Sequence, residues 1–108
     1  MGFSDKKQTM VLDADMDRAF QALAKASAGL EGMKVAASDP AAHQMRLEMP
    51  MSAMSWGTDV LVSMAAVADN KTQVTVEVKS KMPTELFVGG KHQKTAEAVL
   101  AAIKAALA

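Results

Sequence analysis

Two long apolar segments joined by a short polar turn constrain the fold of this chain more than any other feature. They run from Trp56 to Met82, with Asp69-Asn70 between them. In the second segment Val74, Val76 and Val78 alternate with polar residues. Such alternation is typical of an antiparallel strand with one buried face. Because Asp and Asn tolerate left-handed backbone, the sequence predicts a long β-hairpin.

The first segment of this hairpin is apolar on both faces over part of its length. One face carries Thr58, Val60, Val62, Met64 and Ala66, and the opposite face includes Leu61, Ala65 and Val67. Such a strand is either central in a sheet covered on both sides or part of an interface. The sequence leaves both alternatives open.

Apolar periodicity predicts the remaining elements. A strand is expected over residues 8–12, and a helix capped by Asp15 follows and ends near Gly29 and Gly32. Strands over residues 33–38 and 44–49 flank a turn at residues 38–41, and the first places Met33, Val35 and Ala37 on one face. After a hinge-like connection at residues 86–90, a final helix is expected from about Lys91 to Leu107.

The predicted order is strand, helix, four strands, helix, which places the chain in the α+β class. Two adjacent strands before the last helix exclude the ferredoxin-like order. The simplest arrangement is a five-stranded antiparallel sheet with both helices on one face. We expect residues 1–108 to form a single domain, in which residues 1–6 are frayed.

Composition excludes several classes of function. The 12 basic and 12 acidic residues balance, which argues against a dedicated nucleic-acid binder. The absence of cysteine excludes disulfides, thiol nucleophiles and cysteine metal sites. Neither a membrane span nor a signal-peptide core is visible, so we expect a cytoplasmic protein.

The residues that could carry chemistry do not form a catalytic or metal-binding pattern. His43 and His92 lie far apart in the sequence, and no serine lies in a nucleophile elbow or beside an evident base. Asp13, Asp15 and Asp17 lack the glycine and glutamate of a calcium loop, and helix capping explains them better. We therefore expect neither an enzyme nor a metal or cofactor.

The start of the final helix offers a weak candidate for anion binding. Gly89, Gly90 and Lys91 precede His92 at the point where backbone N–H groups of a helix are unpaired. The spacing is not that of a P-loop. The alternative interpretation is that His92 is a partly buried side chain with satisfied hydrogen bonds.

The segment Leu12-Asp13-Ala14-Asp15-Met16-Asp17-Arg18-Ala19-Phe20 is similar to the strand-to-helix junction of START-like, or helix-grip, proteins. In that superfamily a strand ends in Asp-Ala or a similar pair, a capping residue follows, and an aromatic residue lies one turn into the helix. The element order and the long final helix match as well. The chain thus resembles a minimal bacterial member of a group that includes pollen allergens, polyketide cyclases and lipid carriers.

The chain also departs from this superfamily. Full-length members have a second small helix and two more strands, and the element order here is also similar to one half of the TATA-binding protein fold. The resemblance implies a cavity between the sheet and the final helix, but it supplies no catalytic residue that is matched in this sequence.

From these observations we expect a small non-enzymatic domain that binds an apolar or amphipathic small molecule or lipid between the sheet and the final helix. The ten methionines fit either an irregular core or a soft-walled cavity. The residues expected to line the space are Met10, Phe20, Met45, Met64, Phe87, Val99 and Ile103, with Trp56 and His92 nearer its mouth. The alternative is an interaction module without a ligand, which homodimerises through the sheet face that contains Leu61.

Overall fold

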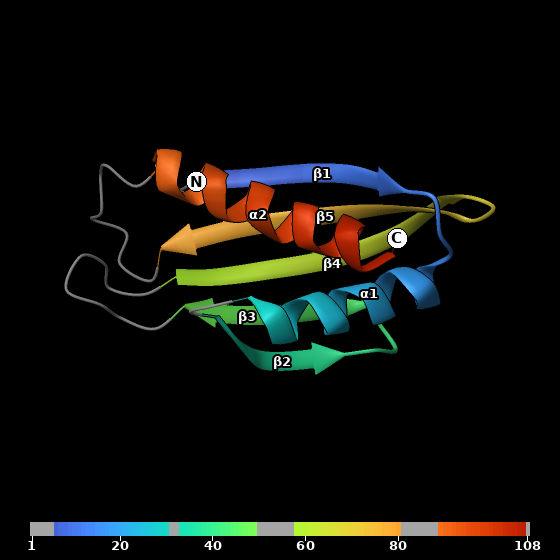
Figure 1. Ribbon diagram of the computed structural model, residues 1–108, viewed down its shortest axis with the longest axis horizontal. Helices are drawn as coiled ribbons and strands as arrows, with labels where there is room; N and C mark the ends of the chain where they lie inside the picture. Colours follow the sequence, from blue (N-terminus) through green and yellow to red (C-terminus); the bar gives the residue numbers. More distant parts are fainter. Residues whose placement is uncertain (1–5, 31–32, 50–57, 81–88, 108) are drawn as a thin grey trace.

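A computed structural model of the chain describes residues 6–30, 33–49, 58–80 and 89–107, with only the backbone at Lys6, Ser80 and residues 89–93. The predictions about Trp56 and Phe87 lie outside these residues. The elements are β1 (Lys6–Leu12), α1 (Met16–Gly29), β2 (Lys34–Asp39), β3 (Gln44–Met49), β4 (Thr58–Ala68), β5 (Lys71–Ser80) and α2 (Gly89–Leu107) (Figure 1). This order is the predicted one.

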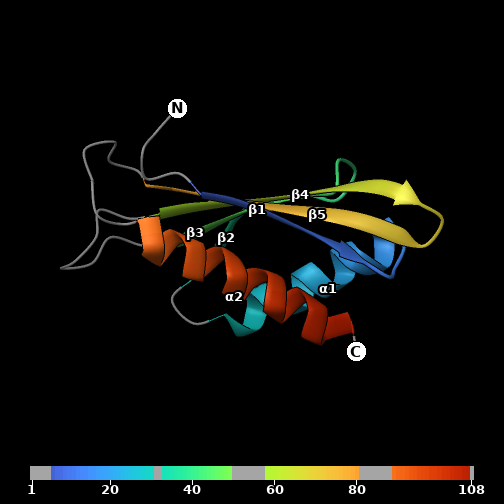
Figure 2. The ribbon, with the colours of Figure 1, turned by 90° about the horizontal axis from the view of Figure 1, so that it is seen from above.

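The five strands form one antiparallel sheet in the order β1-β5-β4-β3-β2, so β4 is the central strand. Both helices lie on the same side of this sheet and pack against each other (Figure 2). The predicted α+β class and the placement of the helices are therefore confirmed. We call the side under the helices the inner face and the opposite side the outer face.

The core lies between the inner face and the two helices. Val74, Val76 and Val78 of β5 are completely buried there, as the alternating pattern predicted. Val99 and Ile103 of α2 are also completely buried against the sheet. Complete burial of each such side chain contributes roughly 1.5 to 3 kcal/mol, so the valine rows and α2 hold the two layers together.

Helix α1 begins and ends with hydrogen bonds that its sequence supplies. The Arg18 backbone N–H donates to Asp15 Oδ1 at 2.7 Å, which confirms Asp15 as the N-cap. At the other end, the backbone N–H of Leu30 donates to the Ser27 carbonyl at 3.4 Å. Between these caps, Phe20 and Leu23 point into the core.

Several local features differ from the prediction. Val35 pairs with Leu47 and Ala37 with Arg46, so a β-bulge places Val35 and Ala37 on opposite faces rather than on one. Helix α2 begins at Gly89, within the segment expected to be a hinge. Strand β1 begins at residue 6, which was expected to be frayed.

The β4–β5 hairpin is the longest unit of the sheet and extends past β3. Its turn is at the predicted place, and Asn70 has a φ of 55°, as a tight turn requires. The pairing of β3 with β4 ends where Gln44 faces Ser63, whereas β4 continues to Ala68. A second bulge lies between Ala66 and Ala68.

Candidate functional site

The structure gathers the predicted lining residues whose side chains it describes into one core cluster. These residues are Met10 of β1, Phe20 of α1, Met45 of β3, Met64 of β4, and Val99 and Ile103 of α2. Met10 is half-buried, and the other five are buried. Trp56 and Phe87 are outside the described residues, and His92 lies in the first turn of α2 with its side chain undescribed. The expected contact of these residues with a ligand stays a prediction.

An open hollow of about 380 Å³ lies where the C-terminal end of α2 meets strand β1. It is lined by Met10, Val11, Leu12, Asp13, Lys104 and Leu107. We call it the β1–α2 hollow. Its walls are about equally polar and apolar, and its charged lining residues are Asp13, just after β1, and Lys104 of α2. Of the predicted lining residues whose side chains the structure describes, only Met10 contributes to it.

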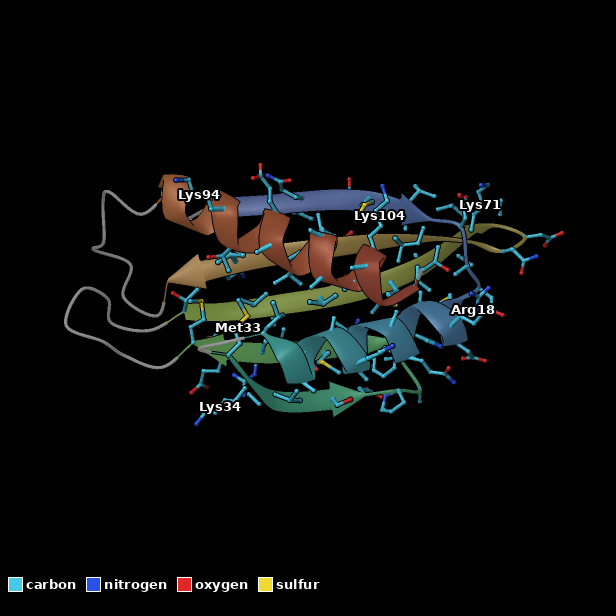
Figure 3. The ribbon with its side chains drawn as sticks, viewed as in Figure 1. Arg18, Met33, Lys34, Lys71, Lys94 and Lys104 are labelled. Atoms are coloured by element: carbon cyan, nitrogen blue, oxygen red, sulfur yellow. The ribbon has the colours of Figure 1, made fainter. Side chains whose placement is uncertain are left out.

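The charges beside this hollow are arranged around Asp13. The Lys71 ammonium group, on the hairpin, donates a hydrogen bond to Asp13 Oδ1 and forms an ion pair with it. This hydrogen bond and the charge of Lys71 lower the pKa of Asp13, and Lys104 adds a smaller effect in the same direction. Figure 3 shows Lys71 and Lys104 toward the same end of the sheet. Counted together, Lys71, Lys104 and Asp13 at this rim carry a net charge of +1.

A buried hydrogen bond fixes the β1–α1 junction beneath that rim. The Thr72 hydroxyl donates to the Ala14 carbonyl at 2.8 Å, and both residues are almost completely buried. Because the acceptor is a backbone carbonyl, the bond fixes the path of the chain at this junction.

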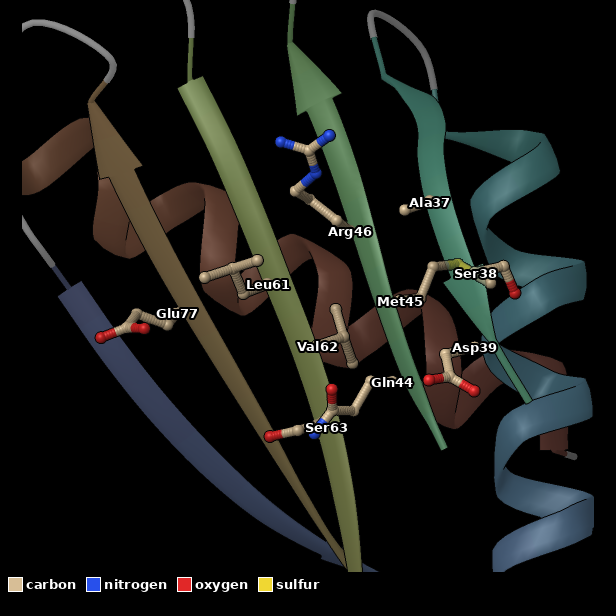
Figure 4. A pocket seen from close by; sticks show the side chains of 10 residues that line it. All are labelled: Ala37, Ser38, Asp39, Gln44, Met45, Arg46, Leu61, Val62, Ser63 and Glu77. Atoms are coloured by element: carbon tan, nitrogen blue, oxygen red, sulfur yellow. The ribbon is translucent and has the colours of Figure 1, made fainter. Parts of the chain in front are cut away.

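A second open hollow, of about 360 Å³, lies on the outer face of the sheet (Figure 4). Its lining residues come from β2, β3, β4 and β5 and are Ala37, Ser38, Asp39, Gln44, Met45, Arg46, Leu61, Val62, Ser63 and Glu77. We call it the outer-face hollow. Sequence reasoning did not find it, because Arg46, Leu61 and Glu77 form one row only through the register of three strands.

His43 makes a contact that the sequence did not predict. It lies in the β2–β3 turn with a φ of 53°. Its Nε2 is 3.1 Å from Asp17 Oδ1, and its ring meets Phe20 edge-on with centroids 5.9 Å apart. These contacts join the turn to α1 across a large separation in sequence.

The structure bears less on three other features considered in the sequence, which are a metal site, an anion site and a membrane span. Among the described residues, no three His, Asp or Glu side chains gather as metal ligands would. Gly89, Gly90 and Lys91 form the start of α2, and their binding of an anion stays a prediction. Neither helix, over its described length, is long and apolar enough to cross a membrane.

Solved structures share this arrangement of sheet and helices over almost the whole chain. A START superfamily protein from Mycobacterium smegmatis superposes with a TM-score of 0.68 at 12% identity, over 95% of this chain and 96% of that one. Ara h 8.0201 superposes with a TM-score of 0.67 at 13% identity, over 95% and 96% of the two chains.

This chain has the helix-grip fold. A further structure with this fold is the di-domain ARO/CYC BexL from the BE-7585A biosynthetic pathway. It superposes with a TM-score of 0.73 at 12% identity, over 95% of this chain and 46% of that two-domain chain. No protein-family model matches the sequence, and no curated protein is similar to it. At such low identity the helix-grip likeness establishes the fold, which confirms the resemblance read from residues 12–20.

Proposed function

We propose that this helix-grip domain binds an amphipathic small molecule with an anionic group in the β1–α2 hollow. The observation that supports the proposal is an opening of about 380 Å³ at the seam where the final helix meets the sheet. Small-molecule sites typically have volumes of about 300 to 1,000 Å³, with apolar walls and a few polar groups. Met10, Leu12 and Leu107 offer the apolar contacts.

The positive rim favours an anionic head group over a cationic one. Lys104 lines the hollow, and Lys71 lies beside it at Asp13. In this arrangement the apolar part of the ligand lies against Met10 and Leu107, and its anionic group reaches Lys104. The ammonium group of an exposed lysine on a helix can move to meet such a group.

The proposed function is binding without catalysis. A general acid or base works best when its pKa is close to the working pH. The pKa of Asp13 is instead lowered by Lys71, which keeps this carboxylate ionised at neutral pH. Asp13 therefore serves to place Lys71 rather than to transfer a proton.

Titration with three single-chain amphiphiles below their micelle concentrations tests this proposal. We expect isothermal calorimetry to show that dodecanoate binds more tightly than dodecyltrimethylammonium or dodecyl maltoside. Lys104→Glu should weaken dodecanoate binding by about fivefold, the equivalent of one exposed ion pair. Leu107→Gln should weaken the binding of all three.

Lys94→Glu is the matched control, because it makes the same charge change on an exposed residue toward the other end of α2 (Figure 3). Dodecanoate should bind this variant as it binds the unaltered protein. Absence of binding by all three amphiphiles would refute the proposal. So would binding that neither Lys104→Glu nor Leu107→Gln changes.

A second candidate function is homodimerisation through the outer face. Strand β4 is central and apolar on both faces, yet no described element covers its outer face. Leu61 is only half-buried there, and Val67 is 51% exposed. A central strand with an uncovered apolar face supports an interface, the second of the two alternatives that its sequence allows.

A further inference from the structure

The outer face carries a row of side chains whose charges differ in sign on the two sides of the central strand. Glu77 of β5, Leu61 of β4 and Arg46 of β3 lie directly opposite one another in the sheet. Figure 4 shows them in this order across the outer-face hollow, with Leu61 between the two charged side chains. Arg46 and Glu77 are therefore about 10 Å apart, two strand spacings, with an apolar residue between them.

The neighbouring row repeats this pattern with the signs exchanged. Two residues along, Lys79 of β5 and Glu48 of β3 flank Asp59 of β4. From the Leu61 row to the Asp59 row, the charge on β5 changes from negative at Glu77 to positive at Lys79. On β3 it changes from positive at Arg46 to negative at Glu48. These four charges on β3 and β5 are thus opposite in sign across the line of β4, and Asp59 lies on that line.

We propose that the outer face binds a second copy of this chain, related by a two-fold axis parallel to β4. This inference rests on the second candidate function and specifies its geometry. A rotation about such an axis places β3 of one copy over β5 of the other. Arg46 then faces Glu77 of the second copy, and this pair occurs twice. Glu48 likewise faces Lys79 of the second copy.

The same charges disfavour the other simple face-to-face arrangement. An axis in the plane of the sheet but perpendicular to the strands would place β3 over β3 and β5 over β5. Arg46 would then face Arg46, and Glu77 would face Glu77. Like charges across an interface are costly, so the pattern selects one orientation.

The residues of β4 lie on the proposed axis and supply its apolar contacts. Leu61 would meet Leu61 of the second copy beside the outer-face hollow. Asp59 also lies near the axis, and its Oδ1 is buried without a hydrogen-bond partner among the described residues. Lys79, its cross-strand neighbour, forms an ion pair with Glu77 of its own chain at 3.6 Å. The strands of two packed sheets cross at about 30°. When the two β4 strands cross at Leu61, Arg46 stays aligned with Glu77 of the second copy, and the Asp59 side chains of the two copies move apart.

The size of this face indicates a weak, reversible dimer. The outer face is five strands wide beside β4 as far as Ser63 and three strands wide from there to Val67. At about 3.3 Å per residue and 4.8 Å per strand spacing this gives roughly 500 Å² per copy. The total of about 1,000 Å² is slightly below the range of standard interfaces. Because the ion pairs lie beside the apolar line, added salt should weaken the association.

Sedimentation equilibrium from about 10 µM to 1 mM protein at low salt tests the proposal. We expect a monomer–dimer equilibrium that shifts toward monomer at high salt. Arg46→Glu and Glu77→Arg should each weaken the dimer by about tenfold, because each places like charges together twice. The double variant should return the dissociation constant to within about threefold of the original, because it restores opposite charges across the axis.

Lys25→Glu is the control, since it makes the same charge change as Arg46→Glu on an exposed residue of α1. It should leave the dimer unchanged, whereas Leu61→Lys should abolish it. Circular dichroism melting of each variant separates loss of the dimer from loss of the fold. A monomer at 1 mM and low salt would overturn the proposal. A dimer whose dissociation constant is unchanged by both Arg46→Glu and Glu77→Arg would overturn it as well.

These results are independent of the ligand experiment. No amphiphile is present during sedimentation, and Lys104 lies on the helix side of the sheet. Failure of amphiphile binding therefore leaves the dimer measurement intact, and a strictly monomeric protein leaves the β1–α2 hollow available.

Discussion

The two faces of strand β5 have the same backbone ladder and opposite roles. On the inner face Val74, Val76 and Val78 are completely buried under the helices. On the outer face Thr75 and Glu77 alternate with them and stay partly exposed. Because both faces share the same interstrand hydrogen bonds, the difference lies in what the side chains touch. The inner face determines the fold, whereas the outer face is available for recognition.

The largest expected effect comes from one substitution made at two adjacent positions of β5. Val76→Asp places an unpaired charge in the core and should cost about 3 to 5 kcal/mol of unfolding free energy, enough to unfold a marginal domain. Thr75→Asp adds the same charge on the outer face and should cost less than about 1 kcal/mol. Urea unfolding followed by circular dichroism measures both. Equal losses would mean that the outer face is also covered.

An intermediate effect is expected from removing one hydroxyl. Thr72→Val keeps the shape of the side chain but leaves the buried Ala14 carbonyl without its donor, at a cost of about 1 to 3 kcal/mol. The matched change Thr75→Val, on the outer face of the same strand, should be within about 0.5 kcal/mol of neutral. Thermal melts at one pH compare the two. A neutral Thr72→Val would show that the hairpin is not fixed to the β1–α1 junction by this bond.

The smallest effect is expected at the exposed ion pair beside the β1–α2 hollow. Lys71 lowers the pKa of folded Asp13, so the pair stabilises the fold above the unfolded value of about 4, and this stabilisation is lost as the pH falls further. Asp13→Asn should therefore melt slightly lower than the unaltered protein at pH 7 and equally at pH 2. In a Lys71→Gln background the same change should have a much smaller effect at pH 7, where only the weaker attraction of Lys104 is lost, and none at pH 2. If the melting temperatures of Asp13→Asn and the unaltered protein still differed at pH 2, the ion pair with Lys71 would not be the cause of the difference.

Much of the fold could be predicted from the sequence because its signals are local. The alternation of Val74, Val76 and Val78 reports one buried face, and Asp15 is followed by an apolar stripe of helical spacing. The bulge between Val35 and Ala37 could not be predicted, since β2 is an edge strand with every residue exposed. Without a buried side, no apolar period marks where its register shifts.

The candidate sites were harder to predict because they depend on contacts between distant segments. Met10 was expected near a ligand, and it does line the β1–α2 hollow. Lys104 and Leu107 were missed, because only the packing of the last turns of α2 on β1 brings them there. The contact of His43 with Asp17 has the same origin, since the two residues meet through the β2–β3 turn.

The bulge near the end of β4 also limits how copies of the chain can associate. Past Ser63 no described strand pairs with β4 on the side of β3, and the last four residues of β4 are exposed and apolar. A straight edge of that composition would template growth by strand addition. The shift in register between Ala66 and Ala68 breaks this edge. Growth of open-ended fibres from the hairpin tip is thereby disfavoured, and closed assemblies with a fixed number of copies are favoured.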